Sequence, residues 1–335
     1  MTLLRTMVAF GWLAAGSSPA GAAVGTSGGQ ILLEPVAARP ASLGEAYAAV
    51  GGTVEALGYN PAGLSELPEA EGSALVRQGF AGDTYASVLG GGAFRGFGLA
   101  AGVSYLTTGP VERIDPTGRV SSVTAESDLV MTAGIARPVP GVPVFVGASA
   151  KLVRSTLLEE SAANDYAADL GAQAAIASAG LRFGASIQHW GGHLRYDDAK
   201  FPVDNNPLPL MWRFGAAWTM AVPVGGSAIG TMESLTAPEV HLAPPPHVLR
   251  ILGEAVLRRL EHATGYGGGL EYAYAGWAFV RGGYRVLASG GAARDSAWSV
   301  GAGVAFSGLR LDYAAEFLSF TTVHRFGVSF IRFPE

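Results

Sequence analysis

Histidine and carboxylate side chains are the groups in this sequence that could ligate a metal or transfer protons. Cysteine is absent, which excludes thiolate nucleophiles and Cys-ligated zinc. Among the six histidines, His189 and His193 lie four residues apart and are followed by Asp197 and Asp198. The Trp-Gly-Gly segment 190–192 indicates a strand end and a loop, and not a helix that presents both imidazoles on one face. We therefore expect no metal site, no cofactor and no catalytic set, and predict that the chain is not an enzyme.

Two glycine-rich segments, 89–98 and 265–269, could in principle cradle a phosphate. Neither lies in the strand–GxGxxG–helix context that binds dinucleotides. Glycine inside a strand more often marks a bend or the close approach of another backbone. We expect these glycines to make room for a segment of the chain that packs against the strands.

The composition favours a membrane β-barrel. Of 335 residues, 48 are Gly, only 15% are charged and 49% are hydrophobic, and the mean hydropathy is +0.29. Past residue 22, no apolar run reaches the roughly 20 residues that a membrane helix needs. A net charge of −5 argues against a nucleic-acid partner. Closed barrels span membranes without such apolar runs.

The first 22 residues have the form of a signal peptide. Arg5 is the only charge before Glu34, the stretch Met7–Ala15 is apolar, and Ala20-Gly21-Ala22 has the form of a cleavage site. Without a cysteine after this site, lipoprotein attachment is excluded. We predict export through this signal and a location in the bacterial outer membrane.

Residues 73–335 show the period-two hydrophobicity of β-strands, broken by Gly, Pro, Asp and Asn. They predict an all-β fold, a transmembrane antiparallel up-and-down barrel of about 14 strands. The ninth predicted strand is the weakest, because its apolar residues also fit a short helix. The predicted strands are 73–80, 84–94, 96–107, 123–137, 143–156, 165–177, 179–190, 209–222, 247–259, 266–275, 277–288, 294–307, 309–318 and 322–333.

The two faces of these strands differ in chemistry. One face is apolar and rich in aromatic residues, as a lipid-facing surface is; the other mixes Gly and Ser with charges of both signs, which suits a narrow polar lumen better than the dry core of a sandwich. Charges in a lumen must be paired. They are interpreted as a salt-bridge network, or as a site for a carboxylate head group at Arg281, Arg285 or Arg325. The charges that alternation places inward are Asp128, Lys151, Arg182, Glu271, Arg281, Arg285, Arg310, Asp312, Glu316 and Arg325.

The segment before the first strand carries a recognisable pattern. It reads Ala-Arg-Pro-Ala-Ser-Leu-Gly-Glu-Ala-Tyr over 38–47, with Arg39 and Gly44, and then Asn-Pro-Ala-Gly-Leu over 60–64. This resembles the N-terminal signature of PorV/PorQ-like proteins within the FadL-like outer-membrane barrels. Leu43, Glu45 and the C-terminal Pro-Glu depart from that pattern. The matching residues are Arg39, Gly44, Asn60, Pro61, Ala62 and Gly63.

The resemblance implies a 14-stranded barrel whose residues 23–72 fold back into the lumen as a short helical hatch. Residues 41–50 are compatible with a helix, and Asn60-Pro61 forms a turn that would end it. A structural role of this turn and a gating or ligand-contact role both stay open.

Two functions are consistent with the resemblance. The first is passive passage or binding of hydrophobic or amphipathic solutes, as in FadL-like transport. The second is a PorV-like accessory or shuttle role in type IX-like secretion, or a purely structural barrel. The expected partners are outer-membrane lipid, a hydrophobic small-molecule ligand, and secretion-system or cargo proteins that would contact loops 108–122 and 191–208.

Overall fold

The structure is a computed structural model that describes residues 27–79, 82–114, 117–196, 206–222, 247–289 and 292–332. The predicted signal peptide, Asp197, Asp198 and the segment 223–246 lie outside the described residues. Within the described part of the chain, no helix has the length and apolar character to cross a membrane.

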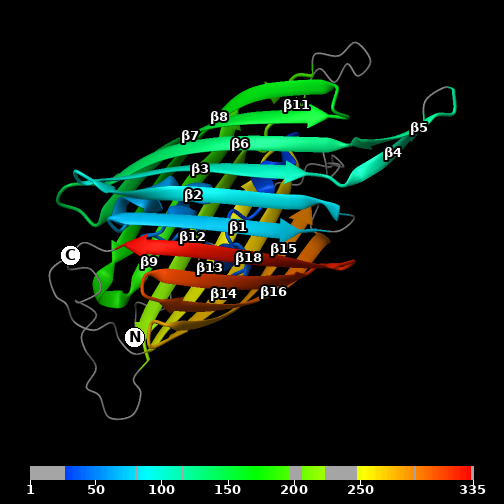
Figure 1. Cartoon of the computed structure of the whole chain (residues 1–335). Coiled ribbons are helices and arrows are strands. Elements are labelled where there is room, and N and C mark those ends of the chain that lie inside the picture. Colours follow the sequence, from blue (N-terminus) through cyan, green and yellow to red (C-terminus); the bar gives the residue numbers. More distant parts are fainter. Residues whose placement is uncertain are drawn as a thin grey trace.

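The described residues form one closed, antiparallel barrel of 14 strands (Figure 1). Strands next to each other along the chain are paired, and β1 pairs with β18 to close the wall. A β4–β5 hairpin (Pro110–Ile114 and Val120–Thr124) and a short β10–β11 pair (His193–Leu194 and Asn206–Pro207) lie outside the wall. The wall strands are β1 Ala70–Gln78, β2 Thr84–Phe94, β3 Phe97–Thr107, β6 Glu126–Pro138, β7 Val144–Leu157, β8 Ser161–Ile176, β9 Leu181–Gly191, β12 Met211–Ala221, β13 His247–Arg258, β14 Ala263–Tyr274, β15 Ala278–Ser289, β16 Ala292–Phe306, β17 Leu309–Phe317 and β18 Thr322–Arg332.

The predicted barrel of 14 strands is confirmed, and the boundaries agree to within a few residues. The ambiguous ninth segment is the strand β13, which pairs along its whole length with β12 and β14. Its apolar residues also have the spacing of a helix, but a helix here would leave the facing edges of β12 and β14 unpaired within the wall. The first strand begins at Ala70 and not at residue 73, so it takes in the end of the predicted hatch.

The wall alternates as a membrane barrel does. Val88, Trp298 and Phe326 point outward and are more than 60% exposed. Their inward neighbours are polar, small or packed against the lumen contents; Arg325, for example, is only 4% exposed. An outward apolar face with aromatic residues needs a hydrocarbon environment, which fits a bilayer.

The two ends of the barrel differ. At one end the connections after β2, β6, β8, β14 and β16 are short. At the other, the hairpin β4–β5 projects well beyond the wall (Figure 1), and residues 192–210 form a long connection. Since outer-membrane barrels carry short periplasmic turns and longer outer loops, we term these the periplasmic end and the outer end.

Residues 27–69 fill the lumen, and we term them the hatch. The hatch contains η1 (Gln30–Leu33), α1 (Ala38–Ala41), η2 (Val54–Gly58) and η3 (Pro61–Glu66), and most of its residues are buried. It begins at the outer end, where the Gly28 amide donates to the Pro207 carbonyl over 2.9 Å. It reaches the periplasmic end at β1 and so passes through the whole lumen.

The helix expected within residues 41–50 is wrong. The only α-helical turn described in the hatch is α1, which ends at Ala41, the first residue of this segment. Gly44 and Glu45 adopt left-handed backbone angles, with φ of 62° and 59°. Such angles stop a right-handed helix, and Gly44 tolerates them without strain.

Candidate functional site

The hatch backbone lies directly against glycines of the wall. A Cβ at Gly98 would overlap the carbonyl of Leu64, and one at Gly184 would overlap that of Ala48. The same holds around the ring, because each of these glycines faces inward. The glycines that seat the hatch in this way are Gly98, Gly147, Gly171, Gly184, Gly267, Gly269, Gly283 and Gly301. Segments 89–98 and 265–269 thus make room for an internal segment, as the sequence indicated.

Arg39 of the hatch anchors α1 to the wall through Glu271. Its Nε and Nη2 donate to the two carboxylate oxygens of Glu271 over 2.8 and 2.7 Å, a bidentate pair. Glu271 also accepts from Arg250 and Arg281, each over 2.7 Å. One carboxylate therefore joins three guanidinium groups, and only Arg39 among them belongs to the hatch.

The same network continues to a second hatch residue. Arg281 donates to Asp312 over 2.6 Å, and Asp312 accepts from Arg310 over 2.7 Å. Arg310 in turn donates to Glu55 of η2 over 2.9 Å. Glu55 accepts the Tyr47 hydroxyl over 2.6 Å. Because burial raises the pKa of Tyr47, its hydroxyl keeps its proton and serves as a donor.

A second network lies closer to the outer end. Glu316 accepts from Arg285 and from Arg325, each over 2.6 Å. Arg285 also lies 3.4 Å from Glu45 of the hatch, and Arg325 lies 3.5 Å from Glu34. The head-group candidates Arg281, Arg285 and Arg325 therefore all have carboxylate partners, and a ligand carboxylate would have to displace one of them.

Arg213 and Glu254 hold the centre of the hatch, and the sequence reasoning missed both. Arg213 donates to Glu254 over 2.6 Å. The other oxygen of Glu254 accepts the amides of Tyr47 and Ala48 over 2.8 and 2.7 Å. Strand alternation places both side chains inward, so the pattern that identified Glu271 could have found them.

Asn60 of the Asn-Pro-Ala-Gly motif is fully buried and forms hydrogen bonds both within the hatch and to the wall. Its Oδ1 accepts the Ala62 amide over 3.1 Å and caps η3. Its Nδ2 donates to the carbonyls of Ala48 over 2.8 Å and Ala172 over 3.0 Å. Pro61 then occupies the first position of η3, which needs no amide hydrogen. The motif thus ties two parts of the hatch to β8.

A buried cluster of Lys151, Asp169 and His189 was not foreseen. Lys151 lies 2.6 Å from Asp169 and 3.0 Å from Nδ1 of His189. Strict alternation along β9 would place His189 on the outward face, next to Ile187, but its side chain is buried in the lumen. The register of β8 and β9 shifts beside Asp169, where His189 takes a φ of 56° and turns inward. A sequence pattern that alternates every second residue does not predict where such a bulge occurs.

The cluster borders a small cavity between the hatch and the wall, of about 40 Å³. At 10–15 Å³ per water, it holds about three waters. A cavity of about 150 Å³ is the size that takes up benzene, so an aromatic solute would enter this cavity only after the hatch moved. The cavity is lined by Ile31, Leu32, Glu34, Val36, Leu57, Gly58, Tyr85, Leu89, Gly102, Ser104, Val130, Thr132, Lys151 and His189.

Histidine and carboxylate side chains do not converge elsewhere in the described residues. No three of them there gather closely enough to hold a metal ion. His189 lies inside the lumen, whereas His193 lies on β10 and is exposed. The arrangement that the structure does provide is a plugged pore: a rigid wall, a hatch held by ion pairs, and a small, mainly apolar cavity between them.

No family model and no curated protein matches this chain. Solved structures do. The CymD monoaromatic hydrocarbon channel is 12% identical over 89% of this chain and 98% of its own, with a TM-score of 0.58. The Ralstonia pickettii toluene transporter TbuX is 13% identical over 89% and 98%, with a TM-score of 0.55. The Pseudomonas putida toluene transporter TodX is 13% identical over 87% and 95%, with a TM-score of 0.54. At such identities the likeness is one of architecture, and the chain has the barrel fold of these hydrocarbon channels.

Proposed function

We propose that this protein is a passive outer-membrane channel for small hydrophobic or amphipathic solutes. The observation that carries the proposal is a 14-stranded barrel whose lumen is filled by an ion-paired hatch. Such a lumen is unsuited to the diffusion of hydrophilic solutes through an open pore. The shared fold with monoaromatic hydrocarbon channels supports the same class of solute.

The small cavity beside Lys151 and His189 marks the route through the lumen. Hatch residues Ile31, Leu32 and Leu57 form one of its sides, so a shift of the hatch enlarges it without opening the wall. Apolar side chains line the cavity together with a few polar ones, among them Lys151 and His189. Ligand sites commonly combine an apolar surface with a few such polar groups.

Uptake of radiolabelled toluene by a Gram-negative host that lacks its own hydrocarbon channel tests this function. Cells that express the wild-type chain should take up toluene faster than cells with an empty vector, whereas arabinose uptake should not change. A Thr132→Trp variant places a large ring in the cavity and should abolish the gain.

The matched control is Ala133→Trp, the adjacent residue on the same strand. Ala133 faces outward and is exposed, whereas Thr132 lines the cavity. Equal toluene uptake by the two variants would place the route elsewhere. Uptake by the wild type at the level of the empty vector would reject the channel function itself.

An accessory role in protein secretion is the alternative. The hairpin β4–β5 favours it, because it projects from the wall (Figure 1) and exposes Ile114 and Val120. In the second expected contact loop, 191–208, the described residues Leu194 and Leu208 are buried in one apolar cluster with Ile31 of the hatch. Stoichiometric co-purification of a protein that is lost when residues 110–124 are replaced by a Gly-Ser turn would favour this role.

A further inference from the structure

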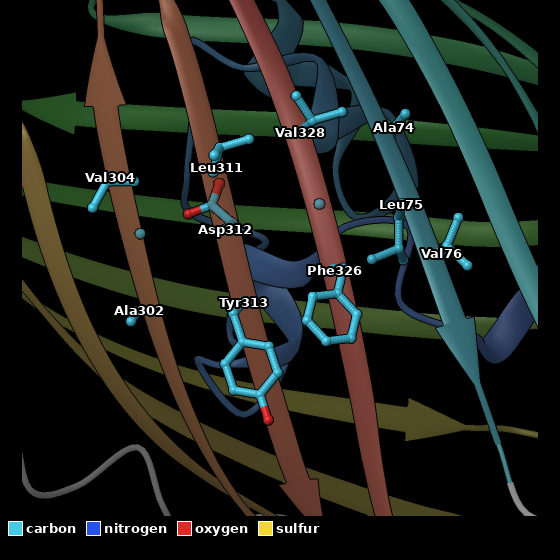
Figure 2. Close-up of a pocket in the computed structure, with 12 residues that line it drawn as sticks. Ala74, Leu75, Val76, Ala302, Val304, Leu311, Asp312, Tyr313, Phe326 and Val328 are labelled. Carbon is cyan, nitrogen blue, oxygen red and sulfur yellow. The ribbon is translucent and has the colours of Figure 1, made fainter.

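A groove on the outward face of the wall crosses the seam where the first and last strands pair. It lies over β16, β17, β18 and β1 and has a volume of about 560 Å³. Figure 2 shows Val76, Val304 and Phe326 around it, with Ala74 and Ala302 at positions that leave space. These side chains belong to the lipid-facing set of the wall. The groove is therefore separate from the lumen.

A polar pair borders this apolar groove. Tyr313 lines the groove, and its hydroxyl lies 2.7 Å from Nδ1 of His324. The two rings are stacked, with centroids 6.1 Å apart, and Tyr313 packs against Phe326 on its other side. His324 is exposed and is the third residue of β18, so it lies towards the outer end.

The Tyr313–His324 pair has hydrogen-bonding capacity left over. When the neutral imidazole accepts the tyrosine hydroxyl at Nδ1, its hydrogen resides on Nε2, which is then a donor. Polar groups that face lipid are costly unless they meet a partner. Near the outer end of the strands, the available partners are the head groups of membrane lipids.

We propose that the groove binds one phosphate-bearing membrane lipid, with an acyl chain against Phe326 and Ala302 and the phosphate at Nε2 of His324. The donor at the head-group level matches an anionic phosphate, and the apolar groove below it matches a hydrocarbon chain. This site rests on the membrane location of the barrel. It does not depend on which solute crosses the lumen.

Native mass spectrometry of delipidated protein tests the site. The protein is incubated with equal amounts of phosphatidylglycerol and diacylglycerol that carry identical palmitoyl chains. The wild type should retain one phosphatidylglycerol in preference to diacylglycerol. Ala302→Phe, which fills the groove, should retain about tenfold less, and Tyr313→Phe should lose the preference for the phosphate by a similar factor.

The control is Ala216→Phe on β12, nearly opposite the seam in the ring of strands. Ala216 is also exposed on the outward face but lines neither this groove nor the cavity in the lumen. It should bind lipid as the wild type does. Equal retention by Ala302→Phe and Ala216→Phe would overturn the proposal. So would a wild-type dimer that Ala302→Phe dissociates, because the occupant would then be a second copy of the chain.

Discussion

Replacing Glu271 with Gln should loosen the hatch while the wall remains closed. Gln has nearly the same shape as Glu, but it lacks the charge and would direct an N–H towards donors of the guanidinium groups. Arg281 would keep Asp312, and Arg250 is partly exposed to water. Arg39 would lose its charged partner and keep the Tyr47 hydroxyl, 3.1 Å away, and one hydrogen bond to the amide oxygen of residue 271. The loss of ion pairing therefore affects mainly Arg39, the residue that anchors α1.

The free-energy cost of Glu271→Gln can be estimated from the burial of the Arg39–Glu271 ion pair. The side chains of Arg39 and Glu271 are 10% and 5% exposed. Removing one partner of a buried ion pair costs about 3–5 kcal/mol. At the lower limit, the population with an undocked hatch should rise by about a hundredfold.

Labelling of a single cysteine measures this population. The chain has no cysteine of its own, and Ser42 beside α1 is fully buried and close to cysteine in size. In a Ser42→Cys background, Glu271→Gln should raise the rate of maleimide labelling by about a hundredfold, because labelling requires local opening. Glu271→Asp should give an intermediate rate.

Glu160→Gln provides the matched control. Glu160 also forms a 2.6 Å ion pair, with Arg113, but both side chains are more than 40% exposed. Exposed pairs contribute about 0–1 kcal/mol, so labelling should hardly change. If the two variants label at the same rate while both barrels keep their heat-modifiable migration on gels, the Glu271 network does not hold the hatch.

Three further outcomes are expected. Asn60→Ala should destabilise hatch docking by about 2–4 kcal/mol, since it removes a cap and the hydrogen bonds of Nδ2 to buried carbonyls; Asn60→Asp keeps the capping oxygen but turns a second carboxylate oxygen towards those carbonyls, so it should destabilise docking at least as much, and limited proteolysis of the hatch compares the variants. Burial raises the pKa of Tyr47 and Tyr59, so the native state keeps protons that the unfolded state loses above pH ~10, and docking should weaken as pH rises past that value. The Tyr59 hydroxyl has no hydrogen-bond partner among the residues that the structure describes, so Tyr59→Phe should leave docking unchanged at neutral pH and reduce this alkaline loss; equal protease sensitivity of the variant and the wild type at high pH would contradict the assignment. Phe326→Asp on the lipid face should destabilise the inserted barrel by about 2–4 kcal/mol, whereas the inward Ser329→Ala should cost far less, which urea titration in liposomes can measure.

Strand alternation predicted most of the wall because a barrel imposes the same rule on every strand. Each residue must face either lipid or lumen, and the two environments select opposite chemistries. For this reason Glu271 and Arg281 could be placed inward and on neighbouring strands before any coordinates, and the register sets them opposite each other. The closure of the wall also explains why β13 is a strand in spite of its helical spacing.

Strand alternation does not predict side-chain direction where the chain departs from regular β-strand geometry. His189 turns inward at a bulge, and the bulge depends on Asp169 accepting its amide over 2.8 Å, a contact between two strands. The hatch adopts short 3₁₀ turns and extended pieces because the glycines of the wall and the buried carboxylates determine its path. Those partners are distant in sequence, so the local pattern of residues 41–50 predicted a helix that the lumen does not permit.

The pairing of β1 with β18 has a consequence for biogenesis. The hatch is made before any strand, yet Glu271, its main anchor, follows Arg39 by 232 residues. Until β14 is in place, Arg39 has no carboxylate partner, although η3 of the hatch can already pack against β6, β7 and β8. Strands from β2 to β18 contact the hatch, so we expect the wall to curl around it before the seam forms. Docking of the hatch and closure of the barrel then occur together, late in folding. This step depends on contacts between residues far apart in sequence, so we expect it to be slow. A chain truncated before β18 should consequently emerge as an open sheet with a loose N-terminus, and not as an unplugged pore.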